Sequence, residues 1–298
     1  MAGRAPRAPA AHRPPLVREP PEFPPPWASA WGDDRFGLWA DLHVTNVVQR
    51  LRWIEPDEFL MGSPDDEPGR FKDEGPQHRV LLTQGFWLAD SACTQVLWLA
   101  VMGGKNPSRF SSDANNPVEN VDWDQAQTFL KNLQASWTEG YAAQLPTEAE
   151  WEYACRAGTT EAYNLGKQVT TAQVNFSGMF AYDDKKPTLG QPRDSTVPVK
   201  SLPPNDWGLY EMHGNVWEWC DDGDLRQYPK LENGEVIENP SQPPEPGPQT
   251  RRVLRGGSWI DYARGARSAG RIAVVRGGRD GDFGFRLALR SSSPEQGS

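Results

Sequence analysis

Three cysteines and four histidines are the residues of this chain best suited to bind a transition metal or to act as nucleophiles. The thiols are Cys93, Cys155 and Cys220, and no two of them form a C-x-x-C pair. This spacing excludes both a disulfide scaffold and a cysteine-based zinc site. Each cysteine has apolar neighbours in the sequence, and we expect all three to be small buried hydrophobic residues.

The histidines are dispersed along the chain. They are His12, His43, His78 and His213, and none of them shows H-x₃-H spacing. The sequence also has no serine-centred elbow, no phosphate-binding loop and no H-E-x-x-H motif. The residues themselves therefore offer little of what common catalytic mechanisms need.

The charged residues indicate internal ion pairs. Residues 251–290 contain ten arginines and three aspartates, which could form a nucleic-acid patch, but the formal net charge of the whole chain is −9. That charge argues against a nucleic-acid partner. We expect buried carboxylate–guanidinium pairs instead, because bidentate geometry can hold irregular loops in place. The groups concerned are Glu148, Glu150, Glu218, Arg255, Arg267 and Arg286.

The composition is that of a globular, turn-rich protein. Of 298 residues, 37% are hydrophobic and 24% charged, and there are 28 glycines, 28 prolines and 13 tryptophans. No stretch approaches the ~20 apolar residues of a membrane-spanning helix. No apolar segment follows Arg4 and Arg7, so we expect a cytoplasmic protein without an ordinary secretory signal. The alternative location is display of the protein on a cell surface.

The elements that must position any site are predicted from capping and periodicity. Asp122 with Gln125, and Thr147 with Glu150, are capping boxes that predict helices over 123–137 and 148–157. A third helix is expected over 91–102. Short strands are expected over 46–53 and 59–62, and residues 80–82 and 86–88 form a strand pair or one bent strand.

The chain divides into one domain with two tails. Nine prolines between residues 6 and 26 predict a disordered tail over 1–26. We expect a single domain over 27–290, with a surface insertion over 224–250, where six prolines occur, and a tail over 291–298. An alternative role for the proline-rich leader is to dock a partner, which would make the chain a stress- or defence-associated interaction module.

Six runs, taken in order, resemble the formylglycine-generating enzyme (sulfatase-modifying factor) superfamily. The resemblance implies an α+β fold, a variant of the C-type lectin fold with short strands, two or three helices and long irregular loops. The matching runs lie at residues 59–62, 117–124, 145–158, 205–219, 252–259 and 284–286.

The resemblance also implies where catalytic groups should stand. The family's enzyme binds copper through two cysteines, two and seven residues after the position of Trp259, and this chain has Asp261 and Ala266 there. A second branch holds iron with three histidines, for which the dispersed histidines here give no match. We therefore expect no catalytic residues, no copper, no iron and no enzymatic activity. The alternative is a metal-dependent, oxygen-using enzyme of the same superfamily.

One calcium site could persist from the family. Carried over by position, its ligands would be Glu211, the carbonyl oxygens of Gly214 and Val216, and the Glu218 carboxylate. Oxygen ligands from a tight loop suit a structural Ca²⁺. The alternative is that Glu218 pairs with an arginine.

Residues 260–283 have an unusual composition. These 24 residues use only Ile, Asp, Tyr, Ala, Arg, Gly, Ser, Val and Phe. All nine can be reached from an asparagine codon by changing its adenines, whereas the absent Lys, Glu, Gln, Met and Trp cannot. The segment resembles the variable proteins of diversity-generating retroelements, those of the Thermus type in particular, although a GC-rich genome would explain much of the bias. The segment over 252–290 would then be the variable-type C-terminal part.

This resemblance implies a non-catalytic protein that displays a diversified surface to a macromolecular ligand, by expectation a protein. Tyr262 and Phe283 would be aromatic anchors, and Gly265, Gly270 and Gly278 would leave concave space. The predicted ligand-binding residues are Ile260, Asp261, Tyr262, Gly265, Gly270, Ile272, Val274, Val275, Gly278, Asp280, Asp282 and Phe283.

Overall fold

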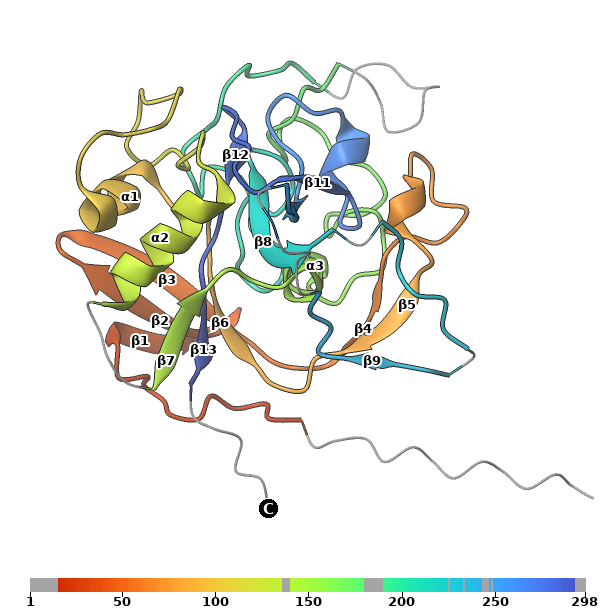
Figure 1. The fold of residues 1–298 in the computed structure, drawn as a ribbon, viewed down its shortest axis with the longest axis horizontal. Helices are drawn as coiled ribbons and strands as arrows, with labels where there is room; N and C mark the ends of the chain where they lie inside the picture. Colours follow the sequence, from red (N-terminus) through yellow and green to blue (C-terminus); the bar gives the residue numbers. More distant parts are fainter. Residues whose placement is uncertain are drawn as a thin grey trace, which may run out of the picture.

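Three sheets and three α-helices make up the fold. The computed structural model describes residues 16–292, except 136–139, 180–189, 225, 233, 243–246 and 248. The described elements form sheets of six, four and three strands. Short strands, three helices and long loops confirm the predicted α+β class (Figure 1).

The largest sheet has the strand order β1-β2-β3-β6-β13-β7, with antiparallel neighbours throughout. The C-terminal strand lies between β6 and β7, so the end of the chain completes the sheet. Residue 291 belongs to this last strand, which corrects the predicted start of the C-terminal tail. The strands are β1 (Ala28–Asp34), β2 (Gly37–Val44), β3 (Val47–Ile54), β6 (Phe86–Ala89), β7 (Tyr141–Gln144) and β13 (Ala288–Ser291).

The four-stranded sheet carries the segment of unusual composition. Its order is β11-β10-β8-β12, and β12 runs parallel to β8, which places Phe283 opposite Trp217. The strands are β8 (Trp217–Gly223), β10 (Arg251–Arg255), β11 (Arg271–Val275) and β12 (Phe283–Gly284).

The three-stranded sheet corrects two expectations. It consists of β4 (Glu58–Met61), β5 (His78–Leu81) and β9 (Ile237–Glu238). Residues 80–82 and 86–88 were expected to form a pair or one bent strand, but β5 and β6 belong to different sheets because the chain turns at 83–85. The 224–250 segment is also more than a surface insertion, because β9 pairs with β5.

The helices begin where the capping residues place them. α2 (Trp123–Gln134) and α3 (Glu148–Arg156) have the capping boxes of Asp122 with Gln125 and of Thr147 with Glu150. α1 (Gln95–Met102) begins later than expected, because Thr94 is its N-cap. The predicted end of the second helix at residue 137 lies outside the described residues. Two 3₁₀ turns, η1 (Lys72–Glu74) and η2 (Ala263–Ala266), complete the set.

Residues 16–26 are packed on the domain, which corrects the boundary predicted for the N-terminal tail. Val17 forms a parallel bridge with Gln84, and the Trp53 Nε1 donates to the Arg18 carbonyl at 2.7 Å. Phe23 stacks on Trp87 with 6.3 Å between the ring centroids. An extended proline-containing segment can pair along an exposed strand edge. A high proline content therefore does not by itself make a segment a disordered tail. Residues 1–15 lie outside the described part.

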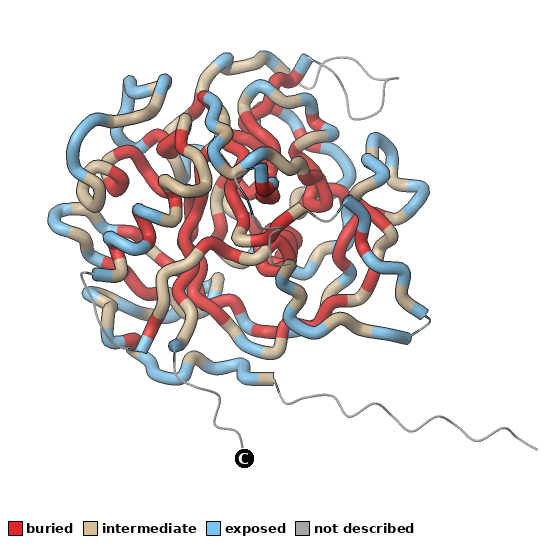
Figure 2. The backbone as a smooth tube through the Cα atoms, in the orientation of Figure 1, coloured by how far each residue is buried: buried red, intermediate tan, exposed pale blue. Residues whose placement is uncertain are grey.

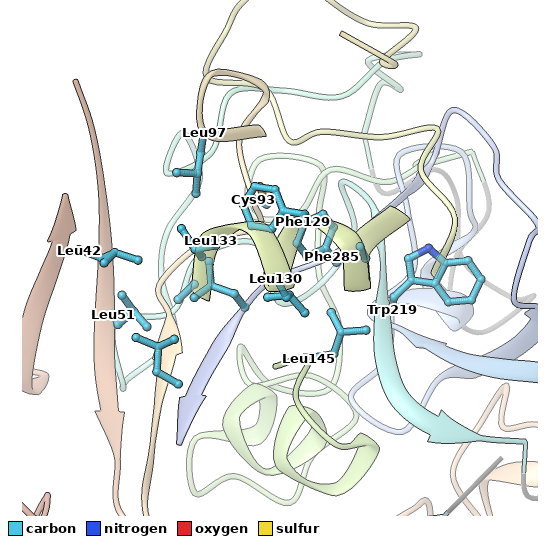
Figure 3. Close-up of a cluster of buried hydrophobic side chains, with 14 of the residues drawn as sticks. Leu42, Leu51, Cys93, Leu97, Phe129, Leu130, Leu133, Leu145, Trp219 and Phe285 are labelled. Atoms are coloured by element: carbon cyan, nitrogen blue, oxygen red, sulfur yellow. The ribbon is translucent and has the colours of Figure 1, made fainter. Parts of the chain in front are cut away.

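The main core lies between α2 and the six-stranded sheet (Figures 2 and 3). Phe129, Leu130 and Leu133 from one face of α2 are buried there with Phe285 and Trp219. The Phe129 and Phe285 rings meet edge to face at 5.2 Å. The helical spacing of the apolar residues in α2 thus places them against Phe285, just before β13.

We expect Phe285→Ala to lower the free energy of unfolding by about 3–5 kcal/mol, since it empties a fully buried aromatic site. Urea denaturation measures the loss. Val48→Ala, at an exposed position of β3, is the control and should change stability by less than about 0.5 kcal/mol. Equal effects of the two substitutions would contradict this placement of the core.

Candidate ligand-binding surface

Residues 260–283 form a surface opposite the side where the described chain begins and ends. In Figure 1, η2, β11 and β12 lie in the upper half of the molecule, and the first and last described residues lie below. The most exposed large apolar side chains of the segment are Ile260, Tyr262 and Val275, at 57%, 45% and 37%. Asp280 is exposed as well.

The other predicted ligand-binding residues are less accessible. Half-buried ones are Asp261, Gly265, Ile272, Val274, Gly278, Asp282 and Phe283, and Gly270 is buried. Two expectations therefore need correction. Phe283 packs edge to face on Trp219 at 5.8 Å and belongs in part to the core. Gly270 and Gly278 leave no concave space, because a Cβ would lie 2.5 Å from the Gly265 carbonyl oxygen at Gly270 and 2.6 Å from the Val274 Cγ1 at Gly278.

Buried arginines hold the backbone beneath this surface. Arg255 and Arg271 extend from adjacent strands, β10 and β11, toward α3. Arg271 binds Glu148 through two hydrogen bonds of 2.6 and 3.0 Å, and Arg255 binds Glu152 and the Gly270 carbonyl. All four charged side chains are at most 5% exposed. These contacts come from buried side chains, so the position of the strands does not depend on the exposed ones. The Arg255 Nε lies 3.6 Å from Glu148 and makes no hydrogen bond among the described residues.

Arg267 and Arg286 fix the two ends of the surface in the same way. Arg267 reaches Glu74 and Glu67 in the loop around η1, with N–O distances of 2.6 and 2.7 Å. Arg286 binds Glu218 through two hydrogen bonds of 2.6 and 2.8 Å. Both guanidinium groups are fully buried.

Buried carboxylate–guanidinium pairs are present, as predicted, but most of the partners differ from the predicted residues. Two ion pairs join predicted residues: Glu218 with Arg286, which is bidentate, and Glu148 with Arg255 at 3.6 Å. Glu150 pairs with Arg290 instead. The residues that sequence reasoning missed are Glu67, Glu74, Glu152, Arg156, Arg271 and Arg290. An available signal was the strand position of Arg271 and Arg290, since a charged residue in a short apolar strand needs a buried partner.

Two glycines follow β10, and the second allows η2 to lie against this loop. Gly256 and Gly257 have φ values of 100° and 72°, in the region that favours glycine. A Cβ on Gly257 would lie 2.8 Å from the Ala266 Cα. The close approach of these two backbones therefore requires glycine.

Three carboxyl groups lie close together beside Ile260. The buried Ser258 hydroxyl is 2.5 Å from an oxygen of Asp261 and 2.9 Å from an oxygen of Asp282. A serine hydroxyl has one proton, so it can donate to only one of them, and the other is linked to it only when that carboxyl is itself protonated. Burial raises the pKa of Asp261, and it raises the pKa of Asp282 to about 6.

Glu119 is the third of these groups. One carboxyl oxygen accepts from the Phe110 N–H at 2.8 Å, and the other, Oε2, is buried without a hydrogen-bond partner among the described residues. Burial raises the pKa of Glu119 to about 7, and the charge of Asp282 contributes in the same direction. None of the three carboxyl groups forms an ion pair with a described lysine or arginine, but Asp261 also accepts the Ser258 N–H at 3.0 Å.

The predicted calcium ligands do not form a donor set. Both oxygens of Glu218 are bound by Arg286, and one of them also accepts from the Trp151 Nε1 at 2.7 Å. Both oxygens of Glu211 accept backbone N–H groups, those of Lys200 and Leu202. The residues as placed do not fit a calcium ion, and the alternative pairing of Glu218 with an arginine is what the structure has.

Comparison with known proteins identifies the family. The profile of the sulfatase-modifying factor enzyme 1-like domain matches residues 42–291. The chain belongs to this family. The formylglycine-generating enzyme of Streptomyces coelicolor is 34% identical over 234 residues, which cover 74% of this chain and 69% of that enzyme. The serine/threonine-protein kinase pkn1 of Chlamydia caviae is 30% identical over 268 residues, and the match spans only 38% of the kinase.

A solved member of the same fold covers more of the chain. The Treponema denticola variable protein 1 superposes with a TM-score of 0.68 and 26% identity, over 85% of this chain and 99% of that protein. The formylglycine-generating-enzyme-like fold is thus shared with both an enzyme and a variable protein. None of the helices among the described residues combines the length and apolar character needed to cross a membrane.

The thiols of this sulfatase-modifying factor family member lie away from the surface. Cys93, Cys155 and Cys220 are all fully buried, as expected, and burial raises the pKa of each. Asp261 and Ala266, at the positions where the resemblance places copper-binding cysteines, lie beside and within η2. The described residues contain no group of three or more His, Cys, Asp or Glu side chains placed to hold a metal ion.

We expect Glu218→Gln to lower the free energy of unfolding by about 3 kcal/mol, because it leaves the Arg286 charge buried without a counter-charge. Thermal and urea denaturation measure the loss, and Glu238→Gln on an exposed strand position is the control. Adding a calcium chelator should leave the melting temperature of the wild type unchanged. A chelator effect in the wild type that disappears in Glu218→Gln would restore the calcium interpretation.

Glu119 should make stability depend on pH. The raised pKa means that the folded protein keeps a proton that the unfolded chain releases above its ordinary pKa of 4.5. This contribution is complete below that value and is lost as the pH rises through about 7. Glu119→Gln should therefore gain about 2 kcal/mol relative to wild type between about pH 5 and pH 8 in urea denaturation. Parallel pH profiles of the two proteins would show that Glu119 is not the titrating group.

Proposed function

We propose that the chain is a non-catalytic ligand-binding protein, a variable protein of the Thermus type, that displays a diversified surface on a formylglycine-generating-enzyme-like scaffold. Residues 260–283 provide the surface and a macromolecule, by preference a protein, is the ligand. The proposal extends to this chain what the name of the Treponema denticola variable protein 1 says of that protein.

One observation carries the proposal. The exposed side chains Ile260, Tyr262, Val275 and Asp280 are interspersed with half-buried and buried residues, and arginine pairs and glycines fix the backbone of the segment. Such a backbone keeps its path when exposed side chains change, because surface substitutions usually alter stability by less than about 0.5 kcal/mol. The same arrangement is required of a protein whose ligand-binding residues vary.

The second candidate function is an oxygen-using, metal-dependent enzyme, favoured by the identity to the Streptomyces coelicolor enzyme. The distinguishing residues are Asp261 and Ala266, because a carboxylate and a methyl group are poor ligands for Cu(I), which prefers thiolates. Metal analysis of the purified protein separates the two functions. Stoichiometric copper or iron would contradict the proposed function.

We expect a library with Ile260, Tyr262, Val275 and Asp280 randomised to consist mostly of folded proteins. Display on a cell surface followed by protease challenge measures the folded fraction. The matched control randomises four buried positions of the same segment, and most of its clones should be lost. These control positions are Ala263, Ala266, Ser268 and Gly270.

If the exposed set tolerates substitution no better than the buried set, residues 260–283 are not a variable surface. The genetic part of the proposal is tested by sequencing the locus. A reverse transcriptase gene with a near-copy of the 260–283 coding segment, differing at adenines, supports diversification. A locus without either leaves a fixed binding protein of the same family.

A further inference from the structure

We propose that a cavity on the far side of the molecule from η2 binds an uncharged small molecule with an aromatic body and one acceptor oxygen. The cavity has a volume of about 660 Å³ and lies between the N-terminal segment, the turn from β5 to β6, α3 and β13. In Figure 1 the described N-terminal segment passes below the ends of β7 and β13, away from η2 and β11. The inference is independent of the proposed function, because no residue of 260–283 lines this cavity.

The wall of the cavity is largely apolar. Its apolar residues come from four segments of the chain: Val17, Pro21, Trp53, Leu82, Phe86 and Pro240. Trp53, Leu82 and Phe86 are buried and belong to the body of the domain. Cavities of roughly 300–1,000 Å³ with mainly apolar walls and a few polar groups are typical of small-molecule sites. Flat rings such as those of Trp53 and Phe86 favour an aromatic ligand.

Trp53 is both a wall of the cavity and the anchor of the N-terminal segment. Its Nε1 donates to the Arg18 carbonyl at 2.7 Å. Its ring lies so close to Gly85 that a Cβ there would be 2.3 Å from the Trp53 Cζ2. The segment is also held by two backbone hydrogen bonds, from the Val17 N–H to the Thr83 carbonyl at 3.0 Å and from the Gly85 N–H to the Val17 carbonyl at 3.4 Å. A ligand against Trp53 would therefore contact the N-terminal segment and the body of the domain together.

The charges in the wall cancel each other. Glu150 and Arg290 both line the cavity and form a bidentate pair, in which the Arg290 Nε lies 2.9 Å from one carboxylate oxygen and Nη2 binds the other. A charged ligand would lose its hydration here without meeting an unpaired counter-charge. An uncharged ligand avoids that cost.

Two donors remain at this end of the cavity. The Thr147 hydroxyl oxygen accepts the Glu150 N–H at 3.2 Å, and its own proton makes no hydrogen bond with a described residue. The bonds of Arg290 to Glu150, Gln144 and the Leu145 carbonyl use four of its five N–H donors. The Glu150 oxygens are already taken by Arg290 and by the Thr147 N–H. The ligand group that suits this end is therefore an acceptor, such as a ketone or amide oxygen.

The test uses the full chain and the fluorophore prodan, an uncharged naphthalene with one ketone, whose emission moves to shorter wavelength in apolar surroundings. We expect saturable binding at one site. Val17→Trp adds an indole at the cavity wall and should weaken binding at least about tenfold, because the added ring occupies the ligand's space. Val48→Trp is the matched control, at a similarly exposed valine outside the wall, and should bind as the wild type does.

A second set of measurements tests the class of ligand. Thr147→Val should weaken prodan binding about fivefold, the effect of one neutral hydrogen bond, whereas Thr147→Ser keeps the hydroxyl and should stay near wild type. The analogue without the ketone should bind the two variants equally. A naphthalene carboxylate should bind the wild type at least about tenfold more weakly than prodan. Thermal melting checks that both variants are folded, because Thr147 is the N-cap of α3.

Limited proteolysis gives a readout that does not depend on fluorescence. Trypsin can cut after Arg18 when the N-terminal segment leaves the domain. Saturating prodan should slow this cut in the wild type, because a ligand that binds only the closed form shifts the equilibrium toward it. The same prodan concentration should give no protection in Val17→Trp. Mass spectrometry identifies the cleavage site.

Each of the following results would overturn the inference. The wild type shows no saturable binding, or Val17→Trp and Val48→Trp bind equally well. The double variant Ile260→Ala/Tyr262→Ala loses binding, which would place the probe on the opposite surface. The carboxylate binds as tightly as prodan, or Thr147→Val and Thr147→Ser do not differ. Binding that appears only after residues 1–15 are removed would make that leader the occupant of the cavity.

Discussion

The structure depends above all on buried pairs of arginines with carboxylates. Arg255, Arg267, Arg271 and Arg286 have almost no contact with solvent, and each binds a glutamate far away in the sequence. The sheets are small and the loops are long, so few ladder hydrogen bonds connect the C-terminal segment to the rest. Replacing one member of such a pair is costly, because the other charge is left in a medium of low dielectric constant.

These pairs let one set of side chains position the backbone while another set faces the solvent. The backbone of residues 260–283 is positioned by guanidinium groups that point inward, and the side chains that point outward take little part in holding it. Phe283 is the exception, because its ring packs on Trp219 and so contributes to both.

Local patterns in the sequence predicted the local structure well and the long-range partners poorly. The capping boxes at Asp122 and Thr147 gave the starts of α2 and α3, and the pairing of arginines with carboxylates followed from composition and charge. The partner of each arginine could not be predicted, because it is set by how distant strands and loops meet. The half-burial of Phe283 has the same cause, since it follows from the parallel pairing of β12 with β8. The packed segment over 16–26 was missed because proline content does not reveal a neighbouring strand edge.

The central place of β13 has a consequence for sequence changes in residues 260–283. The strand inserts between β6 and β7, and the segment 260–283 is synthesised just before it. If residues 260–283 do not adopt their backbone path, β13 cannot insert between β6 and β7. The edges of these two strands then stay unpaired, and unpaired strand edges favour aggregation. If residues 260–283 vary as proposed, the strand that closes the sheet would therefore also separate folded variants from misfolded ones.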